Sequence, residues 1–246
     1  MSINKLGGKG YQLTQLAKIC EVPPFFVISG KESDKEILAE FDKHGFDLVS
    51  VRSSATVEDG VNASFAGMFE TKLNVVREGL IDAIKEVLNS VNSSRVHEYC
   101  RLNNIDAKTV EMRIIVQKMV NSRISGVAIT RESRESDSMI IEVCHGLGEY
   151  LVGGLVTPDT FITCRNTLKV KSKNIGYQGK MLTRDGEKNV PFFLRNCAKI
   201  TDDELTELAK TCLMIEKKMK YKSADIEWAF EGDKLYILQS RPFVAL

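Results

Sequence analysis

Hydrophobic positions along the chain repeat with the period of a helix in some stretches and form short runs in others. The clearest helical repeat places apolar residues at 80, 81, 84, 87, 88 and 91, which is one face of an amphipathic helix. Weaker repeats predict helices after Gly10 and over 34–43, 95–102 and 202–220. Apolar runs predict strands over 25–28, 48–51, 69–75, 112–120, 125–130, 139–144, 160–164 and 168–173, and two more strands close the chain.

Local signals set several ends of these elements. Pro23 and Pro24 stop the first helix, Gly45 ends the second, and Thr201 is placed to cap the last. Strands and helices occur in separate groups more than in alternation, which favours an α+β fold over a doubly wound sheet. The sequence holds no internal repeat and no low-complexity linker.

Composition and charge narrow the class of protein. The 246 residues are 43% hydrophobic and 27% charged, as in ordinary globular domains. Lys and Arg number 34 against 33 Asp and Glu, so a nucleic acid or a membrane surface is not the expected partner. No apolar run approaches the roughly 20 residues that span a bilayer, and residues 1–5 show no secretion signal. The six cysteines form no CxxC pair, so the expected location is a reducing cytoplasm.

The two closing strands carry polar side chains at strand spacing. Asp225 and Glu227 share one face of their strand, because side chains alternate along a strand, and Gln239 and Arg241 do the same. A three-residue loop would place Glu227 opposite Gln239, and the other two polar residues would then also pair. A two-residue loop would place Glu227 opposite Leu238 and split the polar set. The sequence therefore predicts three loop residues.

Two kinds of chemistry fit this predicted hairpin. Carboxylate and amide oxygens suit Mg²⁺ that is bound mainly through nucleotide phosphates. A cross-strand ion pair on a solvated face explains the same residues equally well. The choice depends on the other end of the chain.

The N-terminal part offers candidate phosphate ligands. The cluster at 7–10 precedes a helix, where backbone N–H groups and Lys9 could meet an anion. A short glycine cluster before a helix is more often a simple turn. Arg52 directly follows a predicted core strand, delivered into a loop, and an arginine in that place usually has an assigned partner. The stretch from Ser64 to Gly67 contains residues small enough for backbone amides to approach phosphate oxygens, which alone is a weak signal.

Further candidates lie between these ends. Residues 117–120 end an apolar strand, where backbone groups could face a flat base or simply end the strand. Glu142 lies inside a predicted strand, and a carboxylate there needs a partner or a metal. The glycine-rich stretches 146–149 and 153–154 predict a flexible loop, either a lid or a surface turn.

These segments together resemble the ATP-grasp nucleotide-binding domain of phosphoenolpyruvate synthase, pyruvate phosphate dikinase and rifampicin phosphotransferase. The resemblance runs in collinear order through nearly the whole chain. Its segments are 8–10, 51–59, 63–67, 117–120, 125–127, 146–149 with 156–159, 225–228 and 239–242. It implies one ATP-grasp domain over 1–246, an α+β fold of two subdomains, approximately 1–110 and 111–246, with the nucleotide site between them.

The resemblance implies roles at the phosphate end of the site. Lys9 and Arg52 would contact the phosphates of ATP, and the loop from Ser64 to Gly67 would close over them. Arg241 and Asp225 would complete this end. The implied catalytic residues are the cations Lys9, Arg52 and Arg241, which would stabilise charge on the transferring phosphoryl group.

The resemblance also implies the rest of the nucleotide and metal ligands. The residues implied for the adenine pocket are Gln117, Met119 and Val120. Glu142 would contact ribose or metal. Glu227 and Gln239 would hold Mg²⁺, so the implied cofactors are ATP and Mg²⁺.

The sequence departs from the family pattern in several places. Residues 23–26 read Pro-Pro-Phe-Phe where the family usually has Pro-Pro-Gly-Phe. Residues 130–133 read Thr-Arg-Glu-Ser where the family commonly has Thr, then Asn or Asp, then Pro. The large enzymes also carry the phosphate on a mobile histidine domain, and this sequence has no such motif. His44 and His97 are expected at the surface, and His145 is expected to make a loop contact rather than to accept phosphate.

These observations lead to one main hypothesis and several alternatives. The main hypothesis is a stand-alone Mg·ATP-binding phosphotransferase domain. It would pass phosphate to a phosphohistidine-carrier domain on a partner chain or to a small-molecule acceptor in trans, and dikinase precedent implies AMP as a product. The alternatives are a simple ADP-forming kinase and a non-catalytic nucleotide-binding regulatory module. The chain could also be an excised piece of a longer enzyme.

Overall fold

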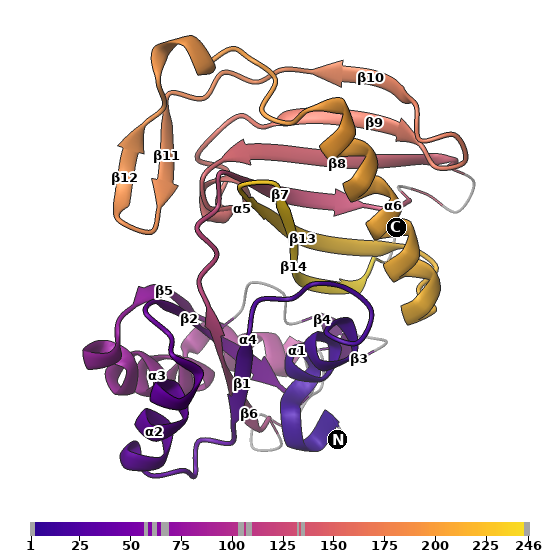
Figure 1. Ribbon diagram of the computed structural model, residues 1–246. Coiled ribbons are helices and arrows are strands. Elements are labelled where there is room, and N and C mark those ends of the chain that lie inside the picture. The colour runs from indigo at the N-terminus through magenta and orange to yellow at the C-terminus, as the bar shows by residue number, and fades with distance from the viewer. Residues whose placement is uncertain are drawn as a thin grey trace. The chain divides into compact units, whose positions relative to one another are not determined.

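Two antiparallel sheets, one of four strands and one of six, organise the chain in the computed structural model (Figure 1). The structure describes residues 3–56, 59–60, 63–64, 69–102, 106, 110–131, 133 and 136–243. Contacts divide the chain into two compact units. Unit 1 comprises Met1–Thr14 and Pro23–Met119, and unit 2 comprises Gln15–Val22 and Val120–Leu246.

The elements of both units have the following bounds. The helices, with short 3₁₀ turns written η, are α1 (Ile3–Leu16), α2 (Asp34–His44), η1 (Arg77–Gly79), α3 (Leu80–Asn89), η2 (Ser90–Asn92), α4 (Ser94–Leu102), α5 (Glu149–Val152), η4 (Phe192–Leu194) and α6 (Asp202–Met219). The first strands are β1 (Phe25–Ile28), β2 (Val49–Ala55), β3 (Asp59–Gly60), β4 (Ala63–Ser64), β5 (Thr71–Val75) and β6 (Met112–Lys118). The later strands are β7 (Ile124–Ile129), β8 (Ser138–His145), β9 (Asp159–Cys164), β10 (Val170–Asn174), β11 (Lys180–Thr183), β12 (Gly186–Asn189), β13 (Ala224–Glu231) and β14 (Lys234–Pro242).

The four-stranded sheet of unit 1 has the order β1-β6-β2-β5 and two chemically different faces. One face supplies Val49, Val51, Ile114 and Val116 to a core that also holds buried side chains of α2, α3 and α4. The opposite face is polar along β2, because the alternate residues of that strand point to it. This division places the hydrophobic core on one side of the sheet and the polar side chains of β2 on the other.

The six-stranded sheet of unit 2 has the order β10-β9-β8-β7-β13-β14. Its buried face includes Ile226 and Trp228 from β13, and α6 packs against that strand. The apolar side of α6 supplies buried Leu208, Cys212 and Ile215. No helix in the described part of the chain is long and apolar enough to cross a membrane.

Two of the three helix-end signals expected from the sequence are confirmed, whereas α1 ends at Leu16, well before Pro23. Thr201 caps α6 in a reciprocal capping box with Glu204, and Gly45 ends α2 at φ 63°. Ser33 forms a second capping box with Glu36 at the start of α2. These caps satisfy backbone groups that the first and last turns would leave unpaired.

Most predicted elements are confirmed, and three corrections matter. The first helix already includes Gly8 and Gly10 and is interrupted at Gly7 rather than beginning after the glycines. Strand β2 runs on to Ala55, so Arg52 lies inside a strand and not in a loop. The β11–β12 hairpin, α5 and η4 were absent from the prediction, because short polar strands such as 186–189 carry no hydrophobic repeat.

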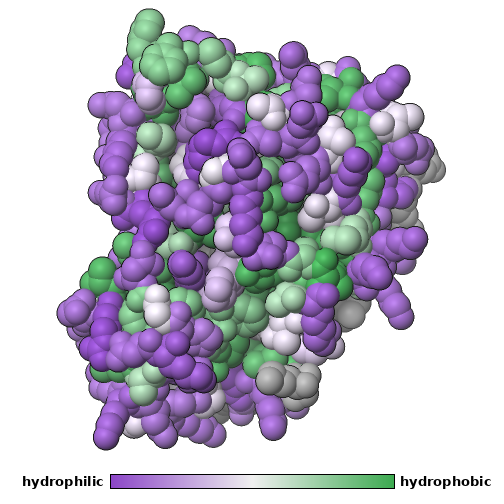
Figure 2. Space-filling model, viewed as in Figure 1, coloured by the Kyte–Doolittle hydropathy of each residue, from purple (hydrophilic) through white to green (hydrophobic). Residues whose placement is uncertain are grey.

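The turn η4 presents apolar side chains to solvent. Phe192 is 85% exposed and Phe193 is 74% exposed, and the pale green surface at the top of Figure 2 lies over this turn. Arg195 lies over the ring of Phe192, with its guanidinium carbon 5.8 Å from the ring centroid. The turn follows β12, whose hairpin with β11 is strongly charged.

An ion pair joins α6 to the turn that follows β9 in unit 2. Arg165 donates to both carboxylate oxygens of Glu216, at 3.0 and 2.7 Å, and Thr130 donates to the same carboxylate. Burial alone would raise the pKa of Glu216, but the hydrogen bonds from Arg165 and Thr130 outweigh it and lower the pKa below its ordinary value of 4.5. The ionised form of Glu216 is therefore the one that the fold stabilises.

We expect Glu216→Gln to lower the free energy of unfolding at pH 7 by about 2 kcal/mol, because the hydrogen bonds from Arg165 lose their charged acceptor. Because the folded pKa is depressed, the wild type holds this stability above pH 4.5 and loses it as the pH falls further. The variant should show a shallower loss in urea titrations below pH 4.5. Glu207→Gln, an exposed site on the same helix, is the control. Parallel pH curves for wild type and Glu216→Gln would contradict the assignment.

A second ion pair lies wholly inside unit 2. Asp159 and Lys199 both have side chains with 0% exposure, and Lys199 Nζ lies 2.5 Å from Asp159 Oδ1. Asp159 also accepts the backbone N–H of Gly176 at 3.0 Å and of Lys199 at 2.8 Å. Lys199 Nζ donates in turn to the Gly176 carbonyl at 2.9 Å. Three separate segments are thus fastened around one buried carboxylate.

We expect Lys199→Met to cost about 3–5 kcal/mol of unfolding free energy, since it leaves the Asp159 charge buried without its cation. The double variant Asp159→Asn with Lys199→Met should recover part of that loss, because it holds no buried charge. Chemical denaturation of the three proteins measures both quantities. A single variant within about 0.5 kcal/mol of wild type would show that the pair is not a determinant of stability.

Candidate functional site

The β13–β14 hairpin brings together the polar residues predicted from the sequence. Glu227 pairs with Gln239 and Asp225 pairs with Arg241, as predicted. The predicted three-residue loop is wrong, because Glu231 pairs with Lys234 and leaves a two-residue turn with a glycine at φ 58°.

A β-bulge reconciles the short turn with the observed pairs. Trp228 pairs with Ile237 while Glu227 pairs with Gln239, so Leu238 is an extra residue on β14. The bulge also changes which residues are buried. Leu235 and Ile237 enter the core, whereas Tyr236 and Leu238 are only half-buried.

Glu227 belongs to a row of paired residues across the unit 2 sheet. Val127 of β7 pairs with Glu227 on one side and with Glu142 of β8 on the other. Directly paired residues point to the same face, so Glu142, Glu227 and Gln239 share a face. Strand β7 lies between Glu142 and Glu227, so their backbones are about 10 Å from each other. Their side chains are half-buried.

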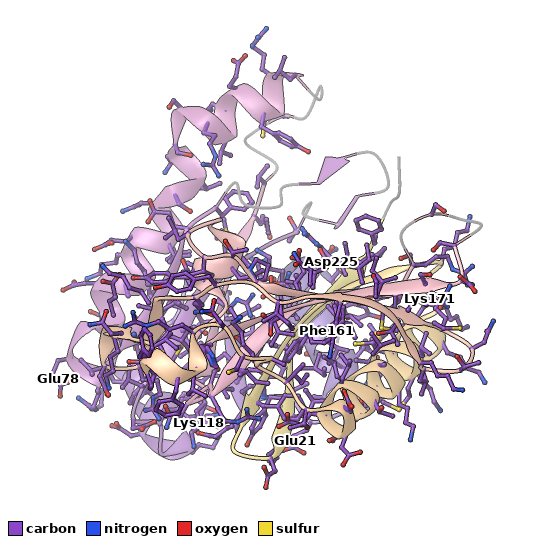
Figure 3. All side chains as sticks on the ribbon, turned by 90° about the horizontal axis from the view of Figure 1, so that it is seen from above. Glu21, Glu78, Lys118, Phe161, Lys171 and Asp225 are labelled. Atoms are coloured by element: carbon purple, nitrogen blue, oxygen red, sulfur yellow. The ribbon has the colours of Figure 1, made fainter. Side chains whose placement is uncertain are left out.

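Asp225 and Arg241 form the neighbouring row on this face (Figure 3 labels Asp225). Arg241 donates from Nε at 2.8 Å and from Nη2 at 2.6 Å, and both bonds end on the same oxygen of Asp225. The cross-strand ion pair that the sequence left open as an alternative is therefore present here. A guanidinium has more than two N–H groups, so Arg241 has further donors besides the two that bind Asp225.

Gly126 lets residues 125–127 of β7 pack closely against the neighbouring strand β8. A Cβ at Gly126 would lie 1.8 Å from the Glu142 carbonyl oxygen and 2.9 Å from a ring carbon of Trp228. The missing side chain lets the Trp228 indole pack over β7 and keeps β7 against β8. The same glycine thereby fixes the position of Glu142.

Arg52 lies on the polar face of unit 1 beside Gln117. Arg52 Nη1 donates to Gln117 Oε1 at 3.3 Å, and Gln117 is only 2% exposed. The amide nitrogen of Gln117 is buried and has no hydrogen-bond partner among the described residues. Because Arg52 takes the amide oxygen, Gln117 turns a donor toward whatever acceptor this face receives.

The end of β6 is less open than the sequence interpretation required. The N–H of Lys118 donates to Pro24 at 2.9 Å, and the N–H of Met119 donates to Leu48 at 2.8 Å. Met119 and Val120 are buried, at 6% exposure each. The backbone N–H groups of residues 118 and 119 are therefore already used within unit 1.

Lys9 lies in the helix that contains the glycine cluster. Gly7 interrupts this helix at φ 69° and ψ 174°, so the turn that holds Lys9 begins a new helical segment. The Gly10 N–H, one of the groups expected to meet an anion, instead donates to the Ser54 hydroxyl at 2.9 Å. Lys9 is half-buried. Neither Ser54 nor its hydroxyl had been singled out from the sequence.

Two predicted residues are not described in full. Ser64 is described only as part of the short strand β4, without its side chain, and Gly67 lies outside the described residues. Within the described ranges, no group of three or more His, Cys, Asp or Glu side chains could hold a metal ion.

Comparison with known proteins assigns the chain to a family. Residues 31–245 match the family described as pyruvate phosphate dikinase, AMP/ATP-binding domain. The chain belongs to this family. A probable phosphoenolpyruvate synthase of Archaeoglobus fulgidus is 41% identical over 204 residues, which cover 80% of this chain and 27% of the relative. The phosphoenolpyruvate synthase of Pyrococcus furiosus is 35% identical over 247 residues, covering 94% of this chain and 30% of the relative.

The dikinase family membership confirms the resemblance predicted from the sequence and with it the α+β ATP-grasp fold. The chain spans less than a third of the length of the two phosphoenolpyruvate synthases. A crystal structure of a Pyrococcus horikoshii Ot3 protein covers 94% of this chain and 88% of its own, with a TM-score of 0.50 and 14% identity. At that identity the likeness concerns the fold alone.

Hydrogen bonds join residues 145–147 to neighbouring segments of unit 2, close to the stretch where the glycines predict a flexible loop. Gln178 accepts the His145 N–H at 2.8 Å and donates to the His145 carbonyl at 3.1 Å, as a neighbouring strand would. Ser125 donates to the Gly146 carbonyl at 2.6 Å, and Leu147 N–H donates to Leu182 at 2.8 Å. Gln178 was not predicted from the sequence, because a single glutamine beside a glycine belongs to no recognisable pattern.

The histidines of the dikinase-type domain agree with their expected places. His44 and His97 are exposed. His145 is half-buried, and burial followed by the nearby Lys199 charge lowers its pKa. The neutral imidazole is therefore favoured near pH 7, and its Nε2 atom has no hydrogen-bond partner among the described residues.

We expect Gly126→Ala to destabilise the dikinase-type domain by about 3 kcal/mol, because the added methyl overlaps the Glu142 carbonyl and crowds Trp228. Trp228 is the single tryptophan, so its fluorescence emission should also shift in the folded variant. Gly79→Ala is the matched control, since a Cβ there meets nothing within 4 Å. Equal stability of the two variants would refute the close-packing argument.

Proposed function

We propose that the chain is a Mg·ATP-binding, dikinase-type phosphotransferase domain that passes a phosphoryl group from ATP to an acceptor outside this chain. The family to which it belongs is described by AMP and ATP binding, which supports a nucleotide ligand. The relatives are named as phosphoenolpyruvate synthases, which supports phosphoryl-transfer chemistry. The observation that carries the proposal is the row of Glu142, Glu227 and Gln239 on one face of the unit 2 sheet.

Unit 1 would supply cations to the ATP phosphates. Arg52 is held on a polar sheet face by Gln117, and Lys9 starts a helical segment on the same unit. Fixed cations stabilise charge that develops on a transferring phosphoryl group without reorganising during the reaction. The buried donor of Gln117 would then meet an oxygen or ring nitrogen of the nucleotide, in line with its proposed place near adenine.

Other residues of the proposed site are carried by the family pattern. Met119 and Val120 would line the adenine pocket with apolar side chains and carbonyl groups, since the N–H of Met119 is already bonded. The loop containing Ser64 and Gly67 would cover the phosphates. Glu142 would contact ribose or metal.

The donor set of unit 2 fits Mg²⁺. Glu227 and Gln239 are directly paired, so a carboxylate oxygen and an amide oxygen leave the sheet side by side. Hard oxygen donors, few in number, are typical of Mg²⁺ sites in which nucleotide phosphates complete the coordination. When bound, Mg²⁺ would neutralise charge on the phosphate oxygens.

Arg241 would act beside this metal site. Asp225 anchors one side of the guanidinium through Nε and Nη2, which fixes the direction of the remaining N–H groups. A planar, oriented guanidinium suits a phosphate oxygen, and Asp225 would position it rather than bind the metal itself.

The acceptor would come from a partner. The matched phosphoenolpyruvate synthases are more than three times as long as this chain, so other domains accompany the corresponding region in them. A phosphohistidine-carrier domain on another chain, or a small molecule bound there, would receive the phosphoryl group. Transfer of the γ-phosphoryl group alone would leave ADP, whereas dikinase chemistry would leave AMP.

We expect calorimetric titration to show Mg·ATP binding to the wild-type chain. Lys9→Ala and Glu227→Gln should each weaken binding by about 10- to 100-fold, because each removes a charged contact to phosphate or metal worth about 1.5–3 kcal/mol. Lys5→Ala, an exposed lysine on the same helix, and Glu207→Gln on α6 are the matched controls and should bind like wild type.

The outcome separates the proposal from its rivals. Loss of affinity only in the two site variants would support nucleotide binding through Lys9 and Glu227. A folded wild type that binds no ATP at millimolar concentration would refute an autonomous nucleotide-binding domain. Binding that is unaffected in Glu227→Gln would remove the metal role from the hairpin.

A further inference from the structure

The Ser54 hydroxyl fastens the first helix to the sheet of unit 1. It accepts the Gly10 N–H at 2.9 Å and donates to the Leu6 carbonyl at 2.8 Å, and Ser54 is fully buried. These bonds bracket the break at Gly7, where the helical geometry is interrupted. A Cβ at Gly7 would lie 2.0 Å from the Ser54 carbonyl oxygen, so only glycine permits this approach.

Ser54 shares its side of β2 with Arg52. Residues two apart on a strand point to the same face, separated by about 7 Å along the strand. Ser54 pairs with Arg113 of β6, which therefore lies on that face too. Arg113 Nη2 donates to the Asn4 carbonyl at 3.0 Å, which adds a third bond between this face and the first helix.

The same contacts set the place of Lys9. Ser54 accepts the N–H of Gly10, which directly follows Lys9. The backbone of Lys9 is therefore held close to Ser54, which lies two positions from Arg52 on β2. We infer that Ser54 is a positioning residue that holds Lys9 in register with Arg52, so that both cations can meet the phosphates of one nucleotide. This inference rests on the proposed function of Lys9 and Arg52 in ATP binding.

A purely structural role for Ser54 is the competing explanation, and the chain contains a matched control. Ser53 is the preceding residue on β2 and is also fully buried. Its hydroxyl points to the opposite face and has no hydrogen-bond partner among the described residues. Ser53→Ala and Ser54→Ala therefore remove the same atom from adjacent buried positions, and only the second breaks the link to the helix.

The test is a double-mutant cycle on ATP affinity. We expect Ser54→Ala to weaken Mg·ATP binding about tenfold, whereas Ser53→Ala changes it less than about twofold. In a Lys9→Ala background, Ser54→Ala should cause little further loss, because the side chain that it positions is already gone. Hydrogen–deuterium exchange of residues 3–16 should rise in Ser54→Ala and stay unchanged in Ser53→Ala.

Each outcome decides a different point. Additive losses in the Lys9→Ala background, or unchanged ATP affinity in Ser54→Ala, would overturn the positioning role while leaving the proposed function intact. A wild type that binds no ATP would overturn the proposed function and, with it, the positioning role of Ser54. If Ser54→Ala does not fold, Ser54→Cys takes its place, because a thiol is only slightly larger and is a weaker donor and acceptor. It should bind Mg·ATP more weakly than wild type, and an affinity equal to that of Ser53→Ala would overturn the positioning role.

Discussion

The register of β13 against its two neighbours is the constraint on which the candidate site depends. β13 pairs with β7 on one side and β14 on the other, and side chains alternate between faces along it. A shift of one residue would turn Glu227 into the core and Trp228 onto the polar face. The burial of Trp228 and Phe230, both at 0% exposure, opposes such a shift and so holds the carboxylates in place.

The bulge at Leu238 is part of the same constraint. The tight turn at Gly232 and Asp233 would by itself place Leu238 opposite Glu227, and the extra residue restores Gln239 to that position. Gly126 contributes from the other side of β13, since only a residue without a side chain lets β7 lie between Trp228 and the Glu142 carbonyl. Core packing and site geometry are therefore two consequences of one pairing pattern.

Strand β2 of unit 1 likewise combines core packing with a candidate site residue. It buries Val49 and Val51 on one face and presents Arg52 on the other.

The parts of this structure that follow from local patterns were predictable from the sequence, and the parts that follow from tertiary packing were not. The amphipathic helix at 80–89, the Thr201 cap and the pairs of the closing hairpin all rest on spacing or capping within a short stretch. The hairpin loop was wrongly predicted because a bulge has no sequence signature separate from the strand around it. Ser54 and Gln178 were missed because each acts through a bond to a residue distant in sequence. The residues of the polar row were identified, but their shared face depends on strand order, which spacing alone does not give.

The central claim is that this chain binds Mg·ATP through the residues proposed for the site. Hydrogen–deuterium exchange of the wild-type chain, with and without saturating Mg·ATP, tests this claim most directly. We expect ATP to slow exchange around Lys9 and Arg52 and around Glu227 and Gln239. Unchanged exchange in either of these two regions would contradict the claim.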